Sequence, residues 1–198
     1  MHTPYKLYRQ QNPKPHFLFR NIPPSKHLVY EKVRWKNHSE ILDMFHGDRN
    51  PHVMNYYKDV YSLMKYINMS LRYYKYSPIT AGCDWFFKLK ETGEYLGVLN
   101  VYDLSIKKFR RQNRYCRIGY ATKESARRKG YASEAVRSLT KYIFKHYDQI
   151  EKIIASIEKD NNPSLIFIKK QGFKYSRSTL FKTDGNTAYE LARGIKSD

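Results

Sequence analysis

The stretch YCRIGYATKESARRKGYASEA, which runs from Tyr115 to Ala135, carries the most information in this sequence of 198 residues. Its first part has the composition of a β-strand, a short basic loop follows, and a helix begins near Gly130. The first turn of a helix leaves backbone N–H groups unpaired, and the helix dipole makes that end positive. Gly130 allows the backbone to approach an anion closely, and the small Ala132 leaves the site open. The stretch therefore predicts a phosphate-binding turn, although an ordinary helix start in a basic surface has the same spacing.

The same residues resemble a known signature. RRKGYA at Arg127–Ala132 is similar to the R/Q-x-x-G-x-G/A motif of the GNAT acetyltransferases. IGY at Ile118–Tyr120 resembles the end of the fourth strand of that family, and GYASEA at Gly130–Ala135 resembles the start of its third helix. The resemblance implies acetyl-CoA (acetyl-coenzyme A) as the co-substrate, its pyrophosphate held by this turn, and a reaction that needs no metal.

Further segments extend the resemblance in both directions. NNPS at Asn161–Ser164, followed by KQGF at Lys170–Phe173, resembles the N-x-x-S…K-x-G-F pattern. That pattern marks the subgroup similar to ribosomal-protein N-terminal (Rim-type) acetyltransferases. Upstream, Asp84–Gly97 resembles the second and third strands of the family. Motifs in this order and spacing imply one GNAT domain over residues 27–198.

The expected fold class is α+β, with a mixed, mostly antiparallel central sheet flanked by helices. Residues 1–26 form a basic, proline-containing arm that would lie over the domain or be partly free. The residue patterns predict strands at His27–Arg34, Cys83–Lys90, Tyr95–Tyr102, Tyr115–Ala121, Lys152–Ile157, Phe173–Phe181 and Thr187–Ala192. They predict helices that begin near Asn37 and that cover Asp59–Lys75, Ala132–His146 and Asn161–Gln171.

The resemblance also implies a set of cofactor-binding residues. These are Ile118, Gly119, Tyr120, Arg127, Arg128, Lys129, Gly130, Tyr131, Ala132, Ser133, Asn161 and Ser164. Gly119 fits a place where the strand bulges away from its neighbour and a backbone amide polarises the thioester carbonyl, although close packing would also explain a glycine. Asn161 would contact the pantetheine arm, cap the following helix, or do both.

The catalytic groups are implied less directly. Ile168 stands where many members of the family have a tyrosine proton donor, so the resemblance offers Ser164 instead. The Ser164 hydroxyl could equally orient the cofactor or cap a turn. Arg117 occupies the position of a glutamate base in the subgroup, and arginine stays protonated. We prefer Asp103 as the base, although it could be a solvated loop carboxylate. The other nearby carboxylates are Asp84, Glu124 and Glu190.

A dedicated base is unnecessary if the acceptor is an α-amino group, whose intrinsic pKa is low. Arg117, together with Arg110, Arg111 and Arg114, could instead line a pocket that favours an anionic acceptor. Aromatic residues are frequent over positions 56–87 and could build a wall of the acceptor site, although core packing explains most of them.

The composition limits the partners. The chain has 37 Lys and Arg against 18 Asp and Glu, a formal net charge of +19. Such a charge attracts anions, so a phosphorylated cofactor, nucleic acid, the ribosome and an acidic membrane face are all allowed. It argues against a strongly cationic acceptor unless the pocket is locally acidic. The two cysteines, Cys83 and Cys116, support neither a disulfide framework nor a metal site, and they predict a cytoplasmic protein. No signal peptide or membrane-spanning segment is expected.

Three functions remain open from the sequence. The preferred one is acetyl transfer to the N-terminus of a protein or peptide, directly and in a ternary complex without an acyl-enzyme. The second is acetylation of a small amine, such as an antibiotic, a polyamine or an amino-acid derivative. The third is a binding module that keeps the fold and has lost the chemistry. A monomer and a homodimer are both compatible with the sequence.

Overall fold

The computed structural model describes residues 21–33, 39–53, 80–105, 114–178, 181 and 185–194. Most of the N-terminal arm, the helix expected at Asp59–Lys75, and Arg110 and Arg111 lie outside the described residues. For these segments the predictions remain predictions.

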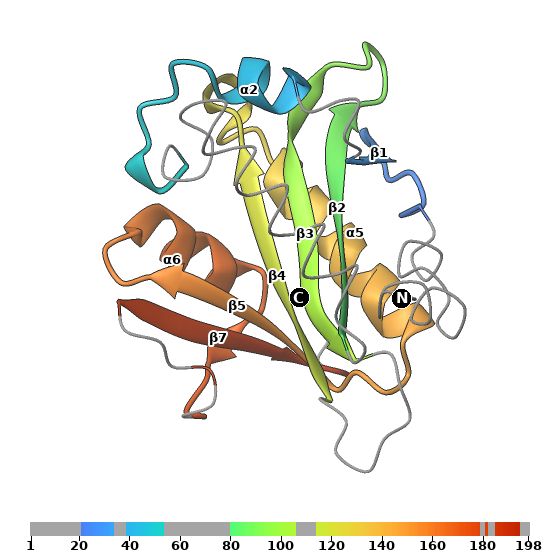
Figure 1. The fold of residues 1–198 in the computed structure, drawn as a ribbon, viewed down its shortest axis with the longest axis vertical. Helices are drawn as coiled ribbons and strands as arrows, with labels where there is room; N and C mark the ends of the chain where they lie inside the picture. The colour runs from blue at the N-terminus through green and yellow to red at the C-terminus, as the bar shows by residue number, and fades with distance from the viewer. Residues whose placement is uncertain are drawn as a thin grey trace, which may run out of the picture.

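A seven-stranded sheet forms the centre of the described part of the chain (Figure 1). Its order is β1 (Leu28–Lys32), β2 (Thr80–Leu89), β3 (Tyr95–Ser105), β4 (Tyr115–Thr122), β5 (Lys152–Glu158), β7 (Asn186–Ala192) and β6 (Lys174–Tyr175). Neighbouring strands are antiparallel except β4 and β5, which are parallel. The predicted α+β class with a mixed, mostly antiparallel sheet is confirmed.

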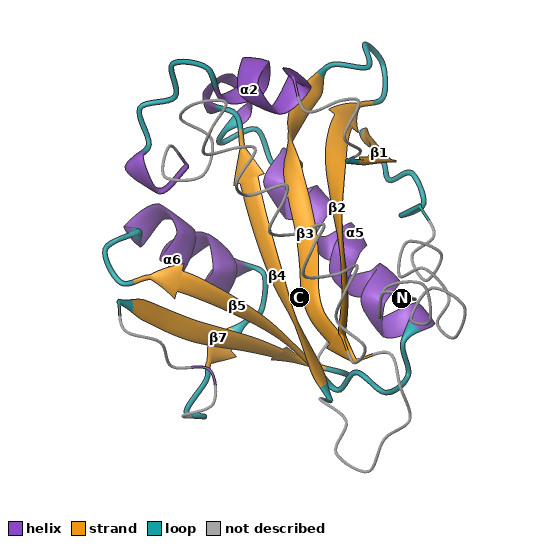
Figure 2. Cartoon of the chain, in the orientation of Figure 1, coloured by secondary structure: helices purple, strands orange, loops and turns teal. Residues whose placement is uncertain are grey.

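Helices cover both faces of this sheet (Figure 2). They are α2 (Ser39–Phe45), the short 3-10 helix η3 (Glu124–Ala126), α5 (Tyr131–His146) and α6 (Asn162–Lys170). On one face, apolar side chains of α5 such as Leu139 join Trp85 and Ile118 in the main core. On the other face, Phe45 of α2 packs with Phe86 in a separate cluster. Because successive strand residues point to opposite faces, Trp85 packs in the main core and Phe86 packs in the separate cluster.

Strands β4 and β5 separate part-way along their length. Their pairing ends at Ile118 and Ala155, yet β4 continues to Thr122 and β5 to Glu158. Meanwhile β4 stays paired with β3 without interruption up to Thr122. The two strands therefore diverge from a common point, as Figure 1 shows. This is the place where the sequence predicts that the strand leaves its neighbour.

One predicted strand is shorter than expected. Among the described residues of Phe173–Phe181, Lys174 and Tyr175 are the ones that pair with β7, and Phe181 lies in a 3-10 turn. Phe173 is buried in the main core, whereas Phe181 is buried beside Tyr115 in a third cluster. Residues eight apart on one strand would point to the same face, so the chain has to leave the sheet between these two rings.

Candidate active site

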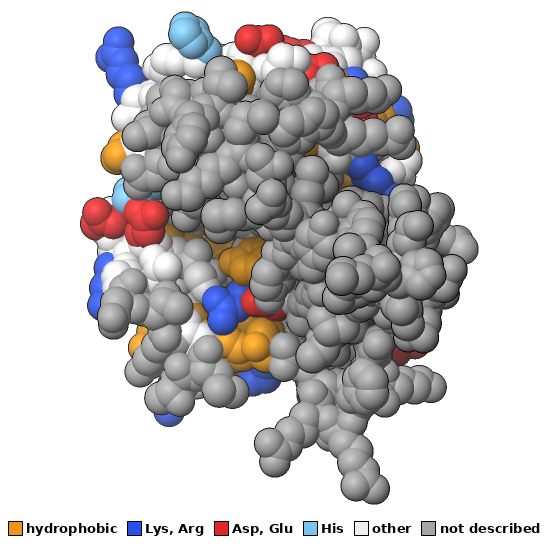
Figure 3. All heavy atoms as spheres, viewed as in Figure 1, with side chains coloured by type: hydrophobic (Ala, Val, Ile, Leu, Met, Phe, Trp, Pro, Cys, Tyr) orange, Lys and Arg blue, Asp and Glu red, His pale blue; other side chains and the backbone are white. Residues whose placement is uncertain are grey.

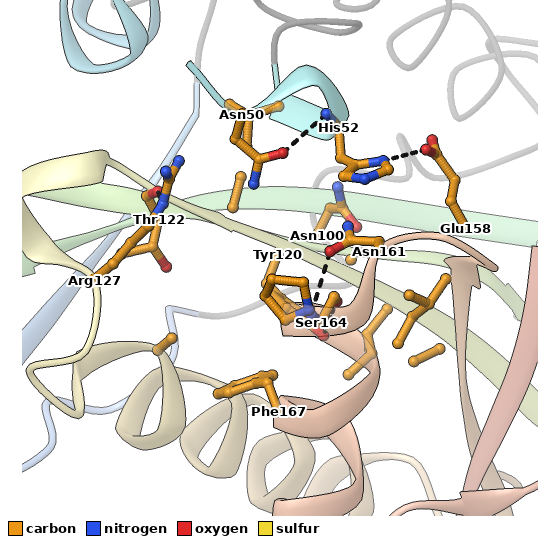
Figure 4. Close-up of a pocket in the computed structure, with 18 of the residues that line it drawn as sticks. Asn50, His52, Asn100, Tyr120, Thr122, Arg127, Glu158, Asn161, Ser164 and Phe167 are labelled. Carbon is orange, nitrogen blue, oxygen red and sulfur yellow. Dashed lines mark hydrogen bonds and ion pairs between the residues drawn. The ribbon is translucent and has the colours of Figure 1, made fainter. Parts of the chain in front are cut away.

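A cavity of about 790 Å³ lies where β4 and β5 diverge (Figure 4). Its walls come from β3, β4, β5, the first turns of α5 and α6, and the segment after α2. Among the lining residues are Asn50, His52, Asn100, Tyr102, Ile118, Gly119, Tyr120, Arg127, Arg128, Gly130, Ala132, Ser133, Ser156, Glu158, Asn161, Ser164 and Phe167. The cavity thus brings together residues far apart in the sequence.

The cavity is lined from both faces of the sheet. Ile118 and Tyr120 point to the face of α5 and α6, where they join the main core. Gly119 lies between them and faces the opposite side, because a Cβ added to it would clash with the side chain of Asn100. Figure 4 accordingly shows Asn50 and His52 on one side of the cavity and Tyr120, Ser164 and Phe167 on the other. Two molecules can therefore meet in this cavity from opposite faces.

The predicted phosphate-binding turn lies at one end of the cavity. Gly130 is the N-cap of α5 and has a φ of 85°, a left-handed conformation that glycine adopts without strain. A Cβ added there would meet no atom within 4 Å, so the turn is open. The backbone N–H groups of the first turn of α5 have no intrahelical acceptors. Gly130, Ala132 and Ser133 line the cavity, which leaves this helix end available to an anion.

The basic side chains of the turn differ in their positions. Arg127 donates hydrogen bonds to the carbonyl of Thr122 and to the carboxylate of Asp48, whose side chain is 2% exposed. Its guanidinium therefore holds the segment after α2 against the turn. Arg128 is exposed and lines the cavity. Lys129 is exposed, and neither it nor Tyr131 is among the lining residues.

Tyr120 and Ser164 form a hydroxyl pair inside the cavity. Their side-chain oxygens share a hydrogen bond of 2.7 Å, and the ring of Tyr120 packs on Phe167 at 4.9 Å. Burial raises the pKa of Tyr120 to about 12, although the bond to Ser164 works in the opposite direction. The Ser164 backbone N–H donates to Asn161 Oδ1 at 3.2 Å, so Asn161 is the N-cap of α6. The pair can hold and pass a proton at neutral pH.

Asp103 does not lie among the residues that line the cavity. One extra residue on β3 between Val101 and Leu104 makes a bulge against β2, and Asp103 in this bulge has a φ of 56°. Its carboxylate forms an ion pair with Arg117 at 3.3 Å. This placement gives no support to Asp103 as the base.

The expected anionic-acceptor pocket around Arg117 is not supported either. The guanidinium is paired with Asp103, stacks near the ring of Phe181 at 5.9 Å, and does not line the cavity. Of the other carboxylates considered, none is a lining residue. Glu190 accepts hydrogen bonds from Ser176 and Lys152, which lower its pKa against the opposing effect of burial.

An imidazole–carboxylate pair at the cavity is not predicted by any sequence pattern. His52 follows α2 in a short helical turn, and its Nδ1 bonds to the carboxylate of Glu158 at the end of β5. Both residues line the cavity. The nearby carboxylate of Asp160 completes a group whose nitrogen and oxygen atoms lie within 4.8 Å of one another. Because 106 residues separate His52 from Glu158, no local pattern signals the pair.

No helix in the ranges that the model describes is long and apolar enough to cross a membrane.

The fold is similar to solved acetyltransferase structures. An acetyltransferase of the GNAT family from Bacillus anthracis is 19% identical, with a TM-score of 0.61 over 85% of this chain and 96% of that one. The aminoglycoside acetyltransferase AAC(6')-Ib, solved with coenzyme A, is 14% identical, with a TM-score of 0.63 over 84% and 95%. RimL, a ribosomal alpha-N-protein acetyltransferase solved with coenzyme A, is 16% identical, with a TM-score of 0.60 over 87% and 98%.

A search of curated proteins found no significant match. The model of the acetyltransferase (GNAT) domain matches residues 32–174, which is most of the chain. This match includes the separation of β4 and β5, the α5 turn and the start of α6. The chain therefore belongs to the GNAT family of acetyltransferases.

Proposed function

We propose that the protein transfers the acetyl group of acetyl-CoA to a primary amine in a ternary complex, with the N-terminus of a protein or peptide as the preferred acceptor. One observation carries this proposal. The cavity between β4 and β5 is lined from both faces of the sheet, with the open α5 turn on one side and His52 on the other. Such a passage lets a thioester and an amine meet without a covalent enzyme intermediate.

The residues at the α5 turn fit coenzyme A. Free N–H groups, the left-handed Gly130 and the exposed Arg128 suit a pyrophosphate. Asn161 and Phe167 also line the cavity, and an amide and an aromatic ring suit the pantetheine arm. Arg127 would act by holding Asp48 and so shaping the turn. Acetyl-CoA, when bound, supplies the acetyl group as an activated thioester.

The chain supplies groups for the two charge changes of the reaction. Beyond Ile118, the edge of β4 that faced β5 has lost its ladder partner, so a backbone N–H of Gly119 or Tyr120 can polarise a carbonyl there. The hydroxyl pair of Tyr120 and Ser164 can give a proton to the departing sulfur. The high pKa of Tyr120 keeps this pair protonated at neutral pH.

The preference for a peptide acceptor rests on two features. The Asn161–Ser164 and Lys170–Phe173 motifs resemble the Rim-type subgroup, and RimL itself acts on a ribosomal protein N-terminus. We call the side of the cavity lined by Asn50, His52 and Asn100 the acceptor face. The neutral amides of Asn50 and Asn100 on this face suit hydrogen bonding to a peptide backbone. The positive net charge of the chain would attract it to the ribosome or to RNA.

A small amine is the second candidate. One observation favours it, namely the acidic rim made by Glu158 and Asp160, because a locally acidic edge attracts a cationic amine. In Figure 3, acidic and histidine side chains gather at the left edge of the molecule. An aminoglycoside acetyltransferase is among the structures with this fold.

We place the enzyme in the cytoplasm, because Cys83 and Cys116 are both free thiols. Burial raises the pKa of each thiol, which leaves both unreactive at neutral pH.

Calorimetric titration of acetyl-CoA tests the cofactor site. Gly130→Glu places bulk and negative charge at the turn, and it should abolish binding that is micromolar in the wild type. Gly93→Glu is the matched control, because Gly93 also has a left-handed φ and open space but lies in the β2–β3 turn. Mass spectrometry with panels of peptides and small amines then identifies the acceptor class. Absence of binding by folded wild-type protein would refute the proposal and leave the binding-module alternative, with RNA affinity as its test.

A further inference from the structure

We infer that His52, oriented by Glu158, is the general base that removes a proton from the acceptor ammonium group. This inference rests on the proposed function and adds a residue that the family signature does not supply. The expected glutamate is replaced by Arg117, and Asp103 is paired with that arginine away from the cavity. Any dedicated base therefore has to come from elsewhere on the acceptor face.

His52 lies on the acceptor face of the passage. Glu158, its partner, is two residues beyond Ser156 on β5, and both point away from the face that Ala155 and Ile157 share with α5. The side chain of His52 is 17% exposed, so the ring borders the cavity and still reaches solvent. A base in this position can take a proton from an incoming amine and release it to water.

Backbone contacts fix the position of His52. Its N–H donates to Asn50 Oδ1 at 3.0 Å, and the Asn50 N–H donates to Asp48 Oδ1 at 2.9 Å. Asp48 is in turn bound by Arg127 of the α5 turn. The turn that carries the base is thus tied to the turn proposed for the cofactor, which would hold the two substrates in register.

The bond to Glu158 determines which ring nitrogen is available. A carboxylate only accepts hydrogen bonds, so Nδ1 carries the proton and donates it to Glu158. In the neutral ring Nε2 then carries a lone pair. Among the described residues, none forms a hydrogen bond with Nε2 of His52. The arrangement is that of a base held by a carboxylate.

The proton balance is complete. Nε2 of His52 accepts one proton from the ammonium, directly or through one water, and the neutral amine then attacks the thioester carbonyl. A C–N bond forms and the C–S bond breaks. The sulfur takes a proton from the Tyr120–Ser164 pair, and the nitrogen's second proton restores that pair. His52 returns its proton to solvent.

Other charged or titratable groups border the same space. They are Tyr102, Tyr120, Arg127, Arg128 and Asp160, besides Glu158. Arg127 is neutralised by Asp48, and the two tyrosines are neutral near pH 7. Asp160 adds negative charge beside the base, and that charge favours the approach of an ammonium group.

The test uses the full chain and the acceptor found by the peptide and amine panel. His52→Gln should lower kcat by about 100-fold or more, with little change in the KM for the acceptor or in acetyl-CoA affinity. His46→Gln, an exposed histidine near the same turn, is the matched control and should keep wild-type rates. Glu158→Gln should fall between these variants.

A second readout does not depend on turnover. In ¹⁵N-resolved spectra of the free protein, the neutral ring of His52 should carry its proton on Nδ1. In Glu158→Ala the ring should change to the Nε2–H form that free histidine favours. An Nε2–H ring in the wild type, or wild-type kinetics in His52→Gln, would overturn the inference while leaving the proposed transfer intact. Loss of acetyl-CoA binding in the wild type would overturn both.

Discussion

Arg127, the first residue of the phosphate-turn signature, donates a hydrogen bond to the buried carboxylate of Asp48, 79 residues earlier in the chain. The same carboxylate accepts from the Asn50 N–H. One buried charge therefore joins the turn proposed for the cofactor to the turn that carries His52.

Asp48→Asn tests this link. The amide oxygen can still accept from Asn50, but the amide NH2 then faces Arg127 and cannot accept a hydrogen bond, so the change removes both the charge and the bond to the guanidinium. Because the guanidinium is only partly exposed and loses its partner, we expect a loss of about 2–3 kcal/mol in the free energy of unfolding, measured with urea. Asp43→Asn, an exposed carboxylate on α2, should be neutral. Equal stability of both variants would show that the pair contributes nothing.

Tyr120→Phe removes one hydroxyl and keeps the ring on Phe167. Acetyl-CoA affinity should be unchanged, while acetyl transfer should fall by about 100-fold because Ser164 loses its partner. The effect is measured as kcat for acetyl transfer at a saturating concentration of the acceptor. A variant as active as the wild type would exclude this pair from the proton path.

The same variant has a signature in alkaline solution. The folded pKa of Tyr120 is about 12 and lies above the ordinary value of 10.0, so its contribution is complete below pH 10. As the pH rises from 10 to 12, the unfolded tyrosine ionises first and stability falls, by about 2–3 kcal/mol for this group. The difference in unfolding free energy between wild type and Tyr120→Phe should shrink by that amount across this window.

Gly119→Ala tests the close approach across the cavity floor. A Cβ at this position would overlap Asn100 Oδ1, so the amide has to move. We expect a loss of about 1–3 kcal/mol in stability and a higher KM for the acceptor. Asn100→Ala in the same chain should restore much of the stability, because it vacates the space. Truncation of a neighbouring side chain should not restore the stability of Gly97→Ala, because the Cβ added there would meet the backbone of Ala121.

Glu134 gives a prediction in acid. It accepts hydrogen bonds from Ser25 Oγ at 2.6 Å and the His27 N–H at 2.7 Å, which tie the segment before β1 to the first turn of α5. Burial raises the pKa of Glu134, but these bonds outweigh it and hold the pKa below the ordinary 4.5. Its contribution is therefore present above pH 4.5 and lost as the pH falls through the folded pKa. Thermal unfolding of Glu134→Gln should show a flatter acid dependence than the wild type.

The opening between β4 and β5 was implied by the family resemblance. Most strands and the α5 turn were predictable, because each depends on a local pattern. The Asn161 cap and Gly130 belong to the same class. Asp103 was not, since a one-residue bulge in β3 turns it toward Arg117. The role of Arg127 also escaped, because its partner lies in another segment. His52 meets Glu158 only through tertiary packing, and a short turn after α2 carries no signal of that partner.

The short ladder between β4 and β5 has a mechanical consequence. Four residue pairs, from Tyr115–Lys152 to Ile118–Ala155, join the two parts of the sheet along this seam. A long, thin molecule that binds between β4 and β5 would contact both parts of the sheet where the backbone pairing has stopped. Binding of this molecule would then stabilise the association of β5 and β7 with the other strands of the sheet. Amide exchange in these two strands should slow on addition of coenzyme A more than exchange in β1 and β2, which lie on the far side of the seam.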